Sequence, residues 1–434
     1  MPKKNRLLVI IPSVLILLLI LAAAAFFGLE YYVTTALKKE IDYHIQEIRE
    51  HVKVDYDSLG VNWLNFTVNM KNVRLWKPPL PGMVTIDRVG VRDFTTIGVN
   101  WIPTRILLDN IALSNEDVRI GIERLNSSFT LKRVPTEDEI EKDWKVILDN
   151  LLSGKLNLTN ISLANEEGQV AIGDISTDFS VGKNEQKNLD LAINGINLQK
   201  DDIRFNSGTL NLAIVLTRDN VLNRLSKRVK DLSFQFPPHL AQGNPLLQQL
   251  SGLGYDRLNV SLDLDYDYQP DTKNLNFMWN GSAQDMGRLQ FDVHLTDFTS
   301  PPLPTNGSLA DILNYLEQLQ IPAQKASLQG VAAVYQDFGL APRLIKAEAQ
   351  AQGQTPEDFV QNLVGSINGY LFLMPLPAAL KEQVYAVNRF LVNPKEIQAA
   401  ITFKKPVRLK NLQEGSISAL LELVGNTDIK ITSK

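Results

Sequence analysis

The sequence predicts an N-terminal transmembrane helix followed by a β-dominated α+β body, in which long antiparallel meanders curl into a groove or a sandwich with amphipathic helices. Three observations lead to this fold class. Residues 7–29 form one uncharged apolar run. Most of the remaining chain consists of β-branched and aromatic runs broken by Gly, Asn and Pro, which is the pattern of strands and turns. A few shorter stretches place apolar residues at helical spacing instead.

The apolar run from Leu7 to Leu29 is long enough to cross a membrane. As a helix with a rise of about 1.5 Å per residue it spans roughly 34 Å, and the hydrocarbon core of a bilayer is about 30 Å thick. Lys3, Lys4 and Arg6 precede the run, which predicts that the N-terminus stays in the cytoplasm. A cleaved signal peptide is the alternative, because alanines occupy positions 22–24. The run continues beyond them, so we expect an uncleaved anchor.

Composition restricts the location and the chemistry. The chain has no cysteine, which excludes disulfides, thiolate zinc sites and cysteine nucleophiles. An exported protein of this size without disulfides fits a bacterial periplasm. We therefore expect a single-pass protein of the bacterial inner membrane, with its N-terminus in the cytoplasm and its body in the periplasm. The net charge of −4 argues against nucleic acid as a partner.

Changes of pattern along the chain divide it into five segments. The apolar stripe after the anchor recurs at spacings of three and four residues, which predicts a helix. The expected segments are 1–29, a cytoplasmic tip and transmembrane anchor; 30–53, a juxtamembrane amphipathic helix; 54–236, a β-rich region; 237–257, a linker; and 258–434, a β-meander region with amphipathic helices.

A short phrase recurs in the β-rich region. It consists of Asn, a β-branched residue, any residue and Leu, and it begins at Asn72, Asn110 and Asn160, with a looser copy at Gly195. Most copies are followed by a polar stretch and another apolar run. The spacing is not constant, so the pattern predicts a repeated strand, polar turn and strand unit rather than a strict solenoid. Such a unit builds an antiparallel meander.

The start of the chain resembles AsmA-like proteins over about residues 1–215. The resemblance rests on the anchor, the short helix, and the phrase DSLGVNWLNFTVNMKNVRL leading to VTIDRVGV. AsmA-like proteins are bacterial envelope proteins related in architecture to bridge-like lipid-transfer proteins. The resemblance implies a sheet curled into a groove whose apolar inner face accepts the acyl chains of phospholipids or other lipids, with a role in outer-membrane biogenesis.

The clearest strand lies at 258–268, where apolar and polar residues alternate strictly. Two further alternating runs, at 275–279 and 289–295, predict the following strands of a meander with one apolar face. We expect the apolar residues of this meander to face lipid, namely Val260, Leu262, Leu264, Tyr266, Phe277 and Phe291. The intervening Asp263, Asp265 and Asp267 suggest calcium ligation as an alternative to a solvated face. We favour the solvated face, because alternate residues of a strand lie in a line and do not converge on a cation.

Other stretches predict helices and strands in alternation. Capping residues and stripes predict helices at 136–153, at 219–236, from Ser308 to Leu319, from Thr355 onward, and from Pro377 to Leu391. Alternation predicts strands at 326–335, 344–351, 397–403 (ended by Pro406) and 428–432.

Motifs for catalysis are missing from the sequence. It contains no G-x-S-x-G, Walker, H-E-x-x-H or G-x-G-x-x-G pattern. The segment from Asp337 to Arg343, DFGLAPR, contains the letters of the kinase metal-binding turn without the other kinase motifs, so we expect a Gly-containing turn between strands there. We predict a non-enzymatic protein with no catalytic residue, no metal site and no cofactor.

The sequence leaves two main functions to consider. An envelope hydrolase is kept as a third. The first is a membrane-anchored periplasmic protein whose apolar β-groove binds or transfers lipid, because a sheet with one continuous apolar face must meet another sheet, itself or lipid. The second is a tethered scaffold that binds other envelope proteins, its sheets closed into an ordinary sandwich. An open apolar sheet favours the first function, whereas a filled core between two sheets favours the second.

Overall fold

The computed structural model describes thirteen stretches of the chain, in addition to Thr35 and Lys39. They are residues 53–62, 67–76, 82–97, 100–114, 118–133, 150–166, 168–182, 184–200, 203–235, 243–303, 325–373, 378–410 and 426–434. Contacts divide the chain into two compact units, residues 1–166 and residues 167–434. The described stretches contain seventeen strands and four helices, which confirms the prediction of a β-dominated body.

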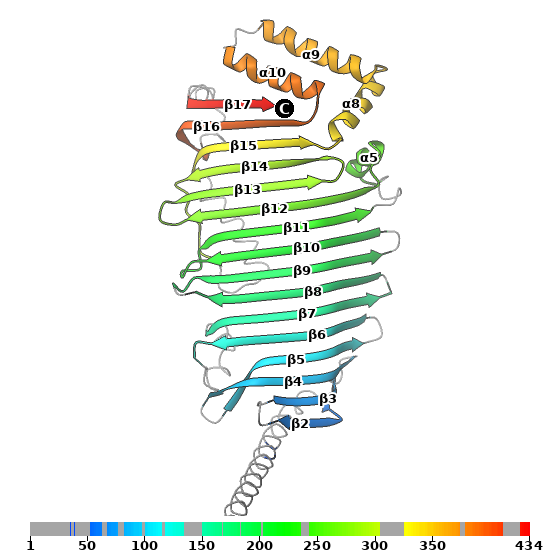
Figure 1. The fold of residues 1–434 in the computed structure, drawn as a ribbon, viewed down its shortest axis with the longest axis vertical. Coiled ribbons are helices and arrows are strands. Elements are labelled where there is room, and N and C mark those ends of the chain that lie inside the picture. Colours follow the sequence, from blue (N-terminus) through cyan, green and yellow to red (C-terminus); the bar gives the residue numbers. More distant parts are fainter. Residues whose placement is uncertain are drawn as a thin grey trace, which may run out of the picture. The chain divides into compact units, whose positions relative to one another are not determined.

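The first unit is an antiparallel meander. Its strands β1 and β2 both pair with β3, and from β3 to β7 each strand pairs with the next (Figure 1). The strands are β1 (Lys53–Asp55), β2 (Ser58–Asn62), β3 (Thr67–Trp76), β4 (Met83–Ile97), β5 (Asn100–Ser114), β6 (Val118–Leu131) and β7 (Leu151–Asn165).

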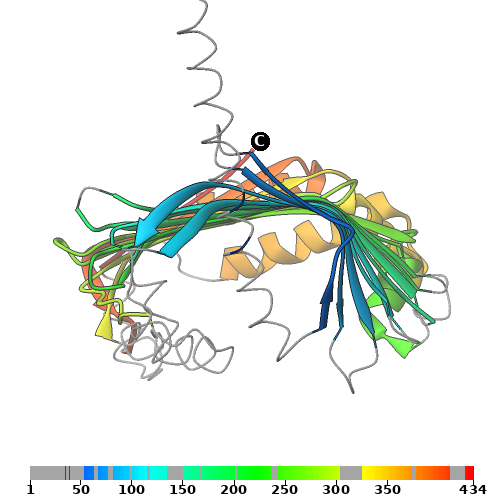
Figure 2. The same cartoon turned by 90° about the horizontal axis from the view of Figure 1, so that it is seen from below.

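The second unit is also an antiparallel meander, with ten strands. From β8 to β17 each strand pairs antiparallel with the next. The strands are β8 (Gly168–Val181), β9 (Lys187–Lys200), β10 (Ile203–Leu216), β11 (Leu222–Gln235), β12 (Arg257–Gln269), β13 (Asn274–Ala283), β14 (Gly287–Thr296), β15 (Ser327–Asp337), β16 (Glu396–Arg408) and β17 (Thr427–Ser433). Viewed along the stack, these strands follow a curved path (Figure 2).

Helices lie at the margins of the second unit. α5 (Pro245–Gly252) precedes β12, and Asn244 caps it, because its side-chain oxygen accepts hydrogen bonds from the backbone N–H groups of Leu246 and Leu247. α8 (Leu340–Ala351), α9 (Pro356–Leu373) and α10 (Ala378–Val392) follow β15 and gather at the β15–β17 end of the sheet (Figure 1). Among the described helices, α10 lies against β16 and β17.

Two predicted elements have the wrong type. The helix predicted at 219–236 is strand β11. The spacing of four and three residues between Leu225, Val229 and Leu232 is that of a helix. In the strand, however, Lys227 lies on the same face between the first two. Asp231, with φ of 55°, shifts the alternation before the third.

The strand predicted at 344–351 is helix α8. The helix begins beside Asp337, whose carboxylate accepts hydrogen bonds from the backbone N–H groups of Gly339 and Ala341. These bonds satisfy donors at the helix start that no intrahelical carbonyl reaches. The strand predicted at 397–403 runs on through Pro406 to Arg408, because Pro406 has no paired residue in β15.

Several other elements agree with the sequence. β12 covers the predicted strand at 258–268, and β15 and β17 lie where alternation placed them. α9 begins at Pro356, and the Thr355 hydroxyl oxygen accepts a hydrogen bond from the Asp358 N–H at 3.1 Å, which is the predicted cap. α10 covers residues 378–392, where a helix was predicted from Pro377 to Leu391.

Some predictions fall outside the described stretches. Within those stretches no helix is long and apolar enough to cross a membrane, and the predicted anchor at 7–29 lies outside them. The helix predicted at 308–319 also lies outside them, as does most of the one predicted at 136–153, whose last residues begin β7. The predicted linker at 237–257 contains α5, and the strands on its two sides, β11 and β12, pair with each other. The contacts place a division elsewhere, after Glu166.

Candidate functional site

The six predicted lipid-facing residues lie on one face of three neighbouring strands. Leu264 pairs with Trp279, which pairs with Phe291, and Tyr266 pairs with Phe277. Val260 and Leu262 continue the same row along β12, because residues two apart in a strand point to one side. The strand register therefore brings the whole predicted set together.

This apolar face extends over all ten strands of the second unit. In each strand the residues on this side are mostly Val, Ile, Leu, Phe, Trp or Tyr, and the register aligns them from strand to strand. Representative rows are Ile175–Ile193–Leu210–Val229–Leu262, Phe179–Leu189–Ile214–Leu225–Tyr266, and Trp279–Phe291–Ala333–Ala399–Ile431. We call this surface the apolar face.

The exposure of large apolar side chains is confined to the same side. Among the strands of the second unit, five such residues are exposed, and all five belong to the apolar face: Leu189 (37%), Leu198 (36%), Phe291 (37%), Ile401 (36%) and Ile429 (37%). Scattered exposed hydrophobic residues are normal on a protein surface. With five on one face and none on the other, the exposed large apolar side chains of these strands all lie on the apolar face.

The opposite face of the sheet is polar, and two aspartates of β12 lie opposite arginines of β11. Asp263 lies opposite Arg228, and it accepts a hydrogen bond from the Asn280 side chain at 3.2 Å. Asp267 lies opposite Arg224, with their charged atoms 3.7 Å apart. The three aspartates considered as calcium ligands thus form a straight row on the polar face, balanced by arginines of β11. Within the described residues no group of three acidic or histidine side chains is arranged to hold a metal.

Protein covers the apolar face near one end of the strands. Tyr266 and Tyr268 are 8% and 4% exposed, and the Phe298 ring packs edge-on against both, with centroids 6.5 and 5.6 Å away. Leu222, Leu275 and Ala326 complete this buried cluster. Of the six predicted residues, Tyr266 therefore belongs to the protein core, whereas the other five are partly exposed.

A helix contacts the apolar face at the β15–β17 end. The Phe390 ring of α10 lies edge-on to Tyr335 of β15, with centroids 5.9 Å apart. The Gln383 amide of α10 donates to the Ile429 carbonyl at 3.0 Å and accepts from the Ile431 N–H. These two backbone groups point away from β16, so Gln383 occupies hydrogen-bonding positions on the outer edge of β17.

Trp279 lies flat along the apolar face because its neighbour in the strand is small. A Cβ atom at Gly281 would come within 2.6 Å of the Trp279 ring and 3.2 Å of Leu262. Gly281 thus provides the space into which the indole folds. Sequence alternation did not identify Trp279 as a site residue, although its register position between Leu264 and Phe291 makes it part of the same surface.

The repeated phrase of the sequence marks a left-handed residue inside alternate strands. Its first residues Asn72, Asn110 and Asn160 have φ of 53°, 52° and 49°, and Gly195 has 66°. Asn and Gly tolerate this conformation better than other residues. The register is continuous across it, since Lys71 pairs with Arg88 and Val73 with Ile86.

A left-handed residue changes which side chains share a face. Apolar residues are three apart across it, as at Met70 and Val73, instead of two, and still align with apolar partners Val89 and Ile86. Each asparagine side chain also donates a hydrogen bond to an acid nearby: Asn72 to Asp57, Asn110 to Asp87 and Asn160 to Glu123. The phrase therefore keeps an apolar face continuous in the first unit as well.

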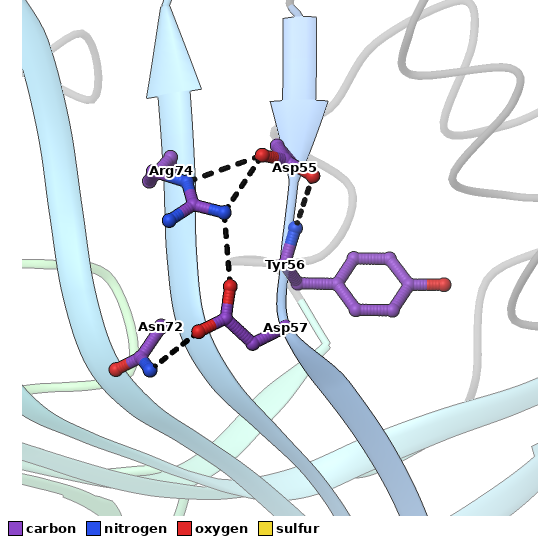
Figure 3. A network of polar contacts seen from close by, with 5 residues as sticks. All are labelled: Asp55, Tyr56, Asp57, Asn72 and Arg74. Carbon is purple, nitrogen blue, oxygen red and sulfur yellow. Dashed lines mark hydrogen bonds and ion pairs between the residues drawn. The ribbon is translucent and has the colours of Figure 1, made fainter.

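The first copy of this arrangement includes an arginine (Figure 3). Arg74 reaches Asp55 at 2.8 Å and Asp57 at 2.9 Å, while Asn72 donates to the other oxygen of Asp57 at 2.7 Å. The hydrogen bond from Asn72 and the charge of Arg74 lower the pKa of Asp57. All these groups are solvated and mutually paired, which suits a structural junction between β1, β2 and β3.

The DFGLAPR segment is a strand-to-helix junction. Asp337 ends β15 and caps α8, and Gly339 has φ of 130°, a conformation suited to glycine. Arg343 lies 4.3 Å over the Tyr255 ring and donates to the Leu253 carbonyl at 3.0 Å. The turn contains Gly339 as expected, but it joins a strand to a helix and not two strands, and Asp337, Gly339 and Arg343 each have a structural role in it.

The comparisons with known proteins give one match. Residues 280–434 match a protein-family model described only as "Uncharacterized protein". No curated protein and no solved structure matches the chain. The matched segment begins within β13 and includes the helices at the β15–β17 end, so it covers less than half of the chain and carries no activity with it.

Proposed function

We propose that this chain is a membrane-anchored bacterial envelope protein whose apolar face binds the acyl chains of lipids. The anchor is the apolar run at 7–29, which would place the body in the periplasm. The AsmA-like pattern of the first 215 residues suggests a role in moving lipid towards the outer membrane. Phospholipid is the expected ligand, and no cofactor enters the proposal.

The observation that carries this proposal is the continuity of the apolar face. Ten consecutive strands align apolar residues on one side, and its exposed members include Leu189, Phe291 and Ile429. Each buried methylene of an acyl chain gains about 0.8 kcal/mol, so a chain laid along such a surface is held without any polar contact.

The alternative of a scaffold with a closed sandwich receives less support. A sandwich needs a second sheet about 10 Å from the first, with two apolar faces against each other. In the second unit every pairing of the described strands joins sequence neighbours, so these strands form one sheet. Among the described residues, Phe298 and Phe390 of α10 pack their rings against its apolar face. Binding to other envelope proteins remains an expectation from the sequence.

A photo-cross-linking residue placed on each side of the sheet tests the proposal. Leu262 lies on the apolar face, and Ser282 lies on the polar face one strand away, opposite Arg288. Benzoylphenylalanine at position 262 of the full chain should form lipid adducts in native membranes, detected by mass spectrometry, whereas the same residue at 282 should form few. Equal yields at the two positions would contradict the proposal.

Leu262→Asp provides a second measurement. On a face open to lipid, water reaches the new carboxylate when lipid is absent, so the protein should fold while retaining less lipid. In a closed core the unpaired charge would cost several kcal/mol, comparable with a whole domain's stability of about 5–15 kcal/mol. Ser282→Asp is the matched control. A Leu262→Asp protein that melts normally and keeps its lipid would exclude this strand as a lipid site.

A further inference from the structure

One charged residue interrupts the apolar face in the middle of the second unit. The register places Lys227 of β11 directly between Leu212 of β10 and Leu264 of β12. Leu225 and Val229 flank it on the same side of its own strand. Its four nearest neighbours on the face are therefore all aliphatic.

No other charged residue of β10, β11 or β12 lies on this side. The remaining charges of the three strands belong to the polar face or the strand ends, as Arg228 and Asp263 do. Lys227 is exposed, and no ion pair joins it to any described residue. By contrast, Arg224 on the opposite face lies 3.7 Å from Asp267.

An ammonium at this position is tolerated only while water reaches it. A lysine on an apolar surface extends its aliphatic stem along its neighbours and keeps its charge in solvent. Acyl chains lying over Leu212, Leu225 and Leu264, which are all partly exposed, would remove that water. A charge that loses its water needs a counter-charge, since an unpaired one is strongly unfavourable.

We infer that Lys227 binds the anionic head of the lipid on the apolar face, a phosphate or a carboxylate. The inference rests on the proposed function and specifies it: the ligand carries a negative charge, and its head lies at β11 while its chains extend over the neighbouring strands. Lysine binds phosphate as a point charge, which suits a ligand whose orientation the acyl chains already fix.

The test uses the full chain with benzoylphenylalanine at position 262, reconstituted in vesicles that contain phosphatidylglycerol, oleate and diacylglycerol. The first probe carries a phosphate, the second a carboxylate and the third no charge. The anionic lipids should be cross-linked about tenfold more efficiently than diacylglycerol, the size expected from one charge-assisted hydrogen bond. The ratio of the two anionic adducts decides between phosphate and carboxylate.

Substitutions at two adjacent positions separate the charge from the surface. Lys227→Met keeps the stem and should abolish the preference while leaving diacylglycerol adducts intact, and Lys227→Arg should restore it. Arg228→Met, on the polar face of the same strand, should leave it unchanged. The inference would be overturned if the protein with Lys227 did not prefer anionic lipids, or if Lys227→Met still preferred them. Either result would leave the proposed function standing. Absence of all three adducts from the wild type would overturn both.

Discussion

The left-handed asparagines make a prediction that depends on backbone conformation more than on contacts. Asn110 has φ of 52° within β5, and its side chain donates to Asp87 at 2.9 Å. Replacing it with alanine removes the hydrogen bond and places a Cβ-bearing residue without a local polar partner in this conformation. Replacing it with glycine removes the same hydrogen bond and relieves the backbone.

The expected losses of stability follow from two effects, the left-handed backbone conformation and the hydrogen bond to Asp87. The left-handed conformation costs an ordinary residue about 1–2 kcal/mol. The hydrogen bond lies at the surface and contributes about 0.5 kcal/mol, the low end of the usual range. Asn110→Ala should therefore lose about 2 kcal/mol of stability. Asn110→Gly should lose about 1 kcal/mol, from the hydrogen bond and the added entropy of the unfolded chain.

Urea unfolding of the full chain, monitored by pulse proteolysis of the first unit, measures the difference in stability between the two variants. The control is Asn126→Ala in β6, a strand asparagine outside the set of left-handed residues, which should change stability by less than about 0.5 kcal/mol. Equal losses for Asn110→Ala and Asn110→Gly would show that the backbone conformation contributes nothing. A loss for Asn126→Ala as large as for Asn110→Ala would show that the phrase is not special.

Two further predictions concern the β15–β17 end. Gln383→Leu removes the amide that pairs with the outer edge of β17, so hydrogen exchange at the Ile431 amide should accelerate and the protein should associate at high concentration; unchanged exchange would contradict the pairing. The Lys434 ammonium, 2.7 Å away, and the Gln336 amide lower the pKa of Glu396 to about 2 from its usual 4.5. Because the folded-state pKa is depressed, the stabilisation is complete above about pH 4.5 and is lost as the pH falls towards 2. The protection factors of the β16 amides, which are corrected for the intrinsic pH dependence of exchange, should fall more over that window in the wild type than in Glu396→Gln.

The sequence predicted elements wherever one local rule decided the structure. Strict alternation identified β12, and a capping threonine followed by proline identified the start of α9. The repeated Asn phrase was visible, but its meaning was not, because φ values inside a strand depend on pairing with the neighbouring strands. α8 was missed because its cap, Asp337, lies three residues before the helix, behind a glycine turn that alternation does not detect.

The sequence predicted the common face of the six candidate residues, while their contact with lipid stays a prediction. All six residues lie on one face, because register follows from the hydrophobic pattern. The sequence did not indicate which of the six residues would be buried by other parts of the protein. Tyr266 is buried by Phe298, a residue beyond the end of β14, and such a contact depends on the path of a loop.

The largest error of the sequence prediction, β11, has the same origin as the proposed head-group contact. A strand of a one-sided sheet should alternate without interruption, and a leucine at position 227 would have made β11 as recognisable as β12. The lysine breaks the alternation at a position where all four neighbours on the face are aliphatic, so packing gives no reason for it. Departures from local rules concentrate at functional positions, because function is the usual reason for keeping a residue that stability disfavours. Lys227 breaks the alternation that would have predicted the strand and places a charge on an apolar surface. It is therefore the position at which the charge of a ligand should be sought first.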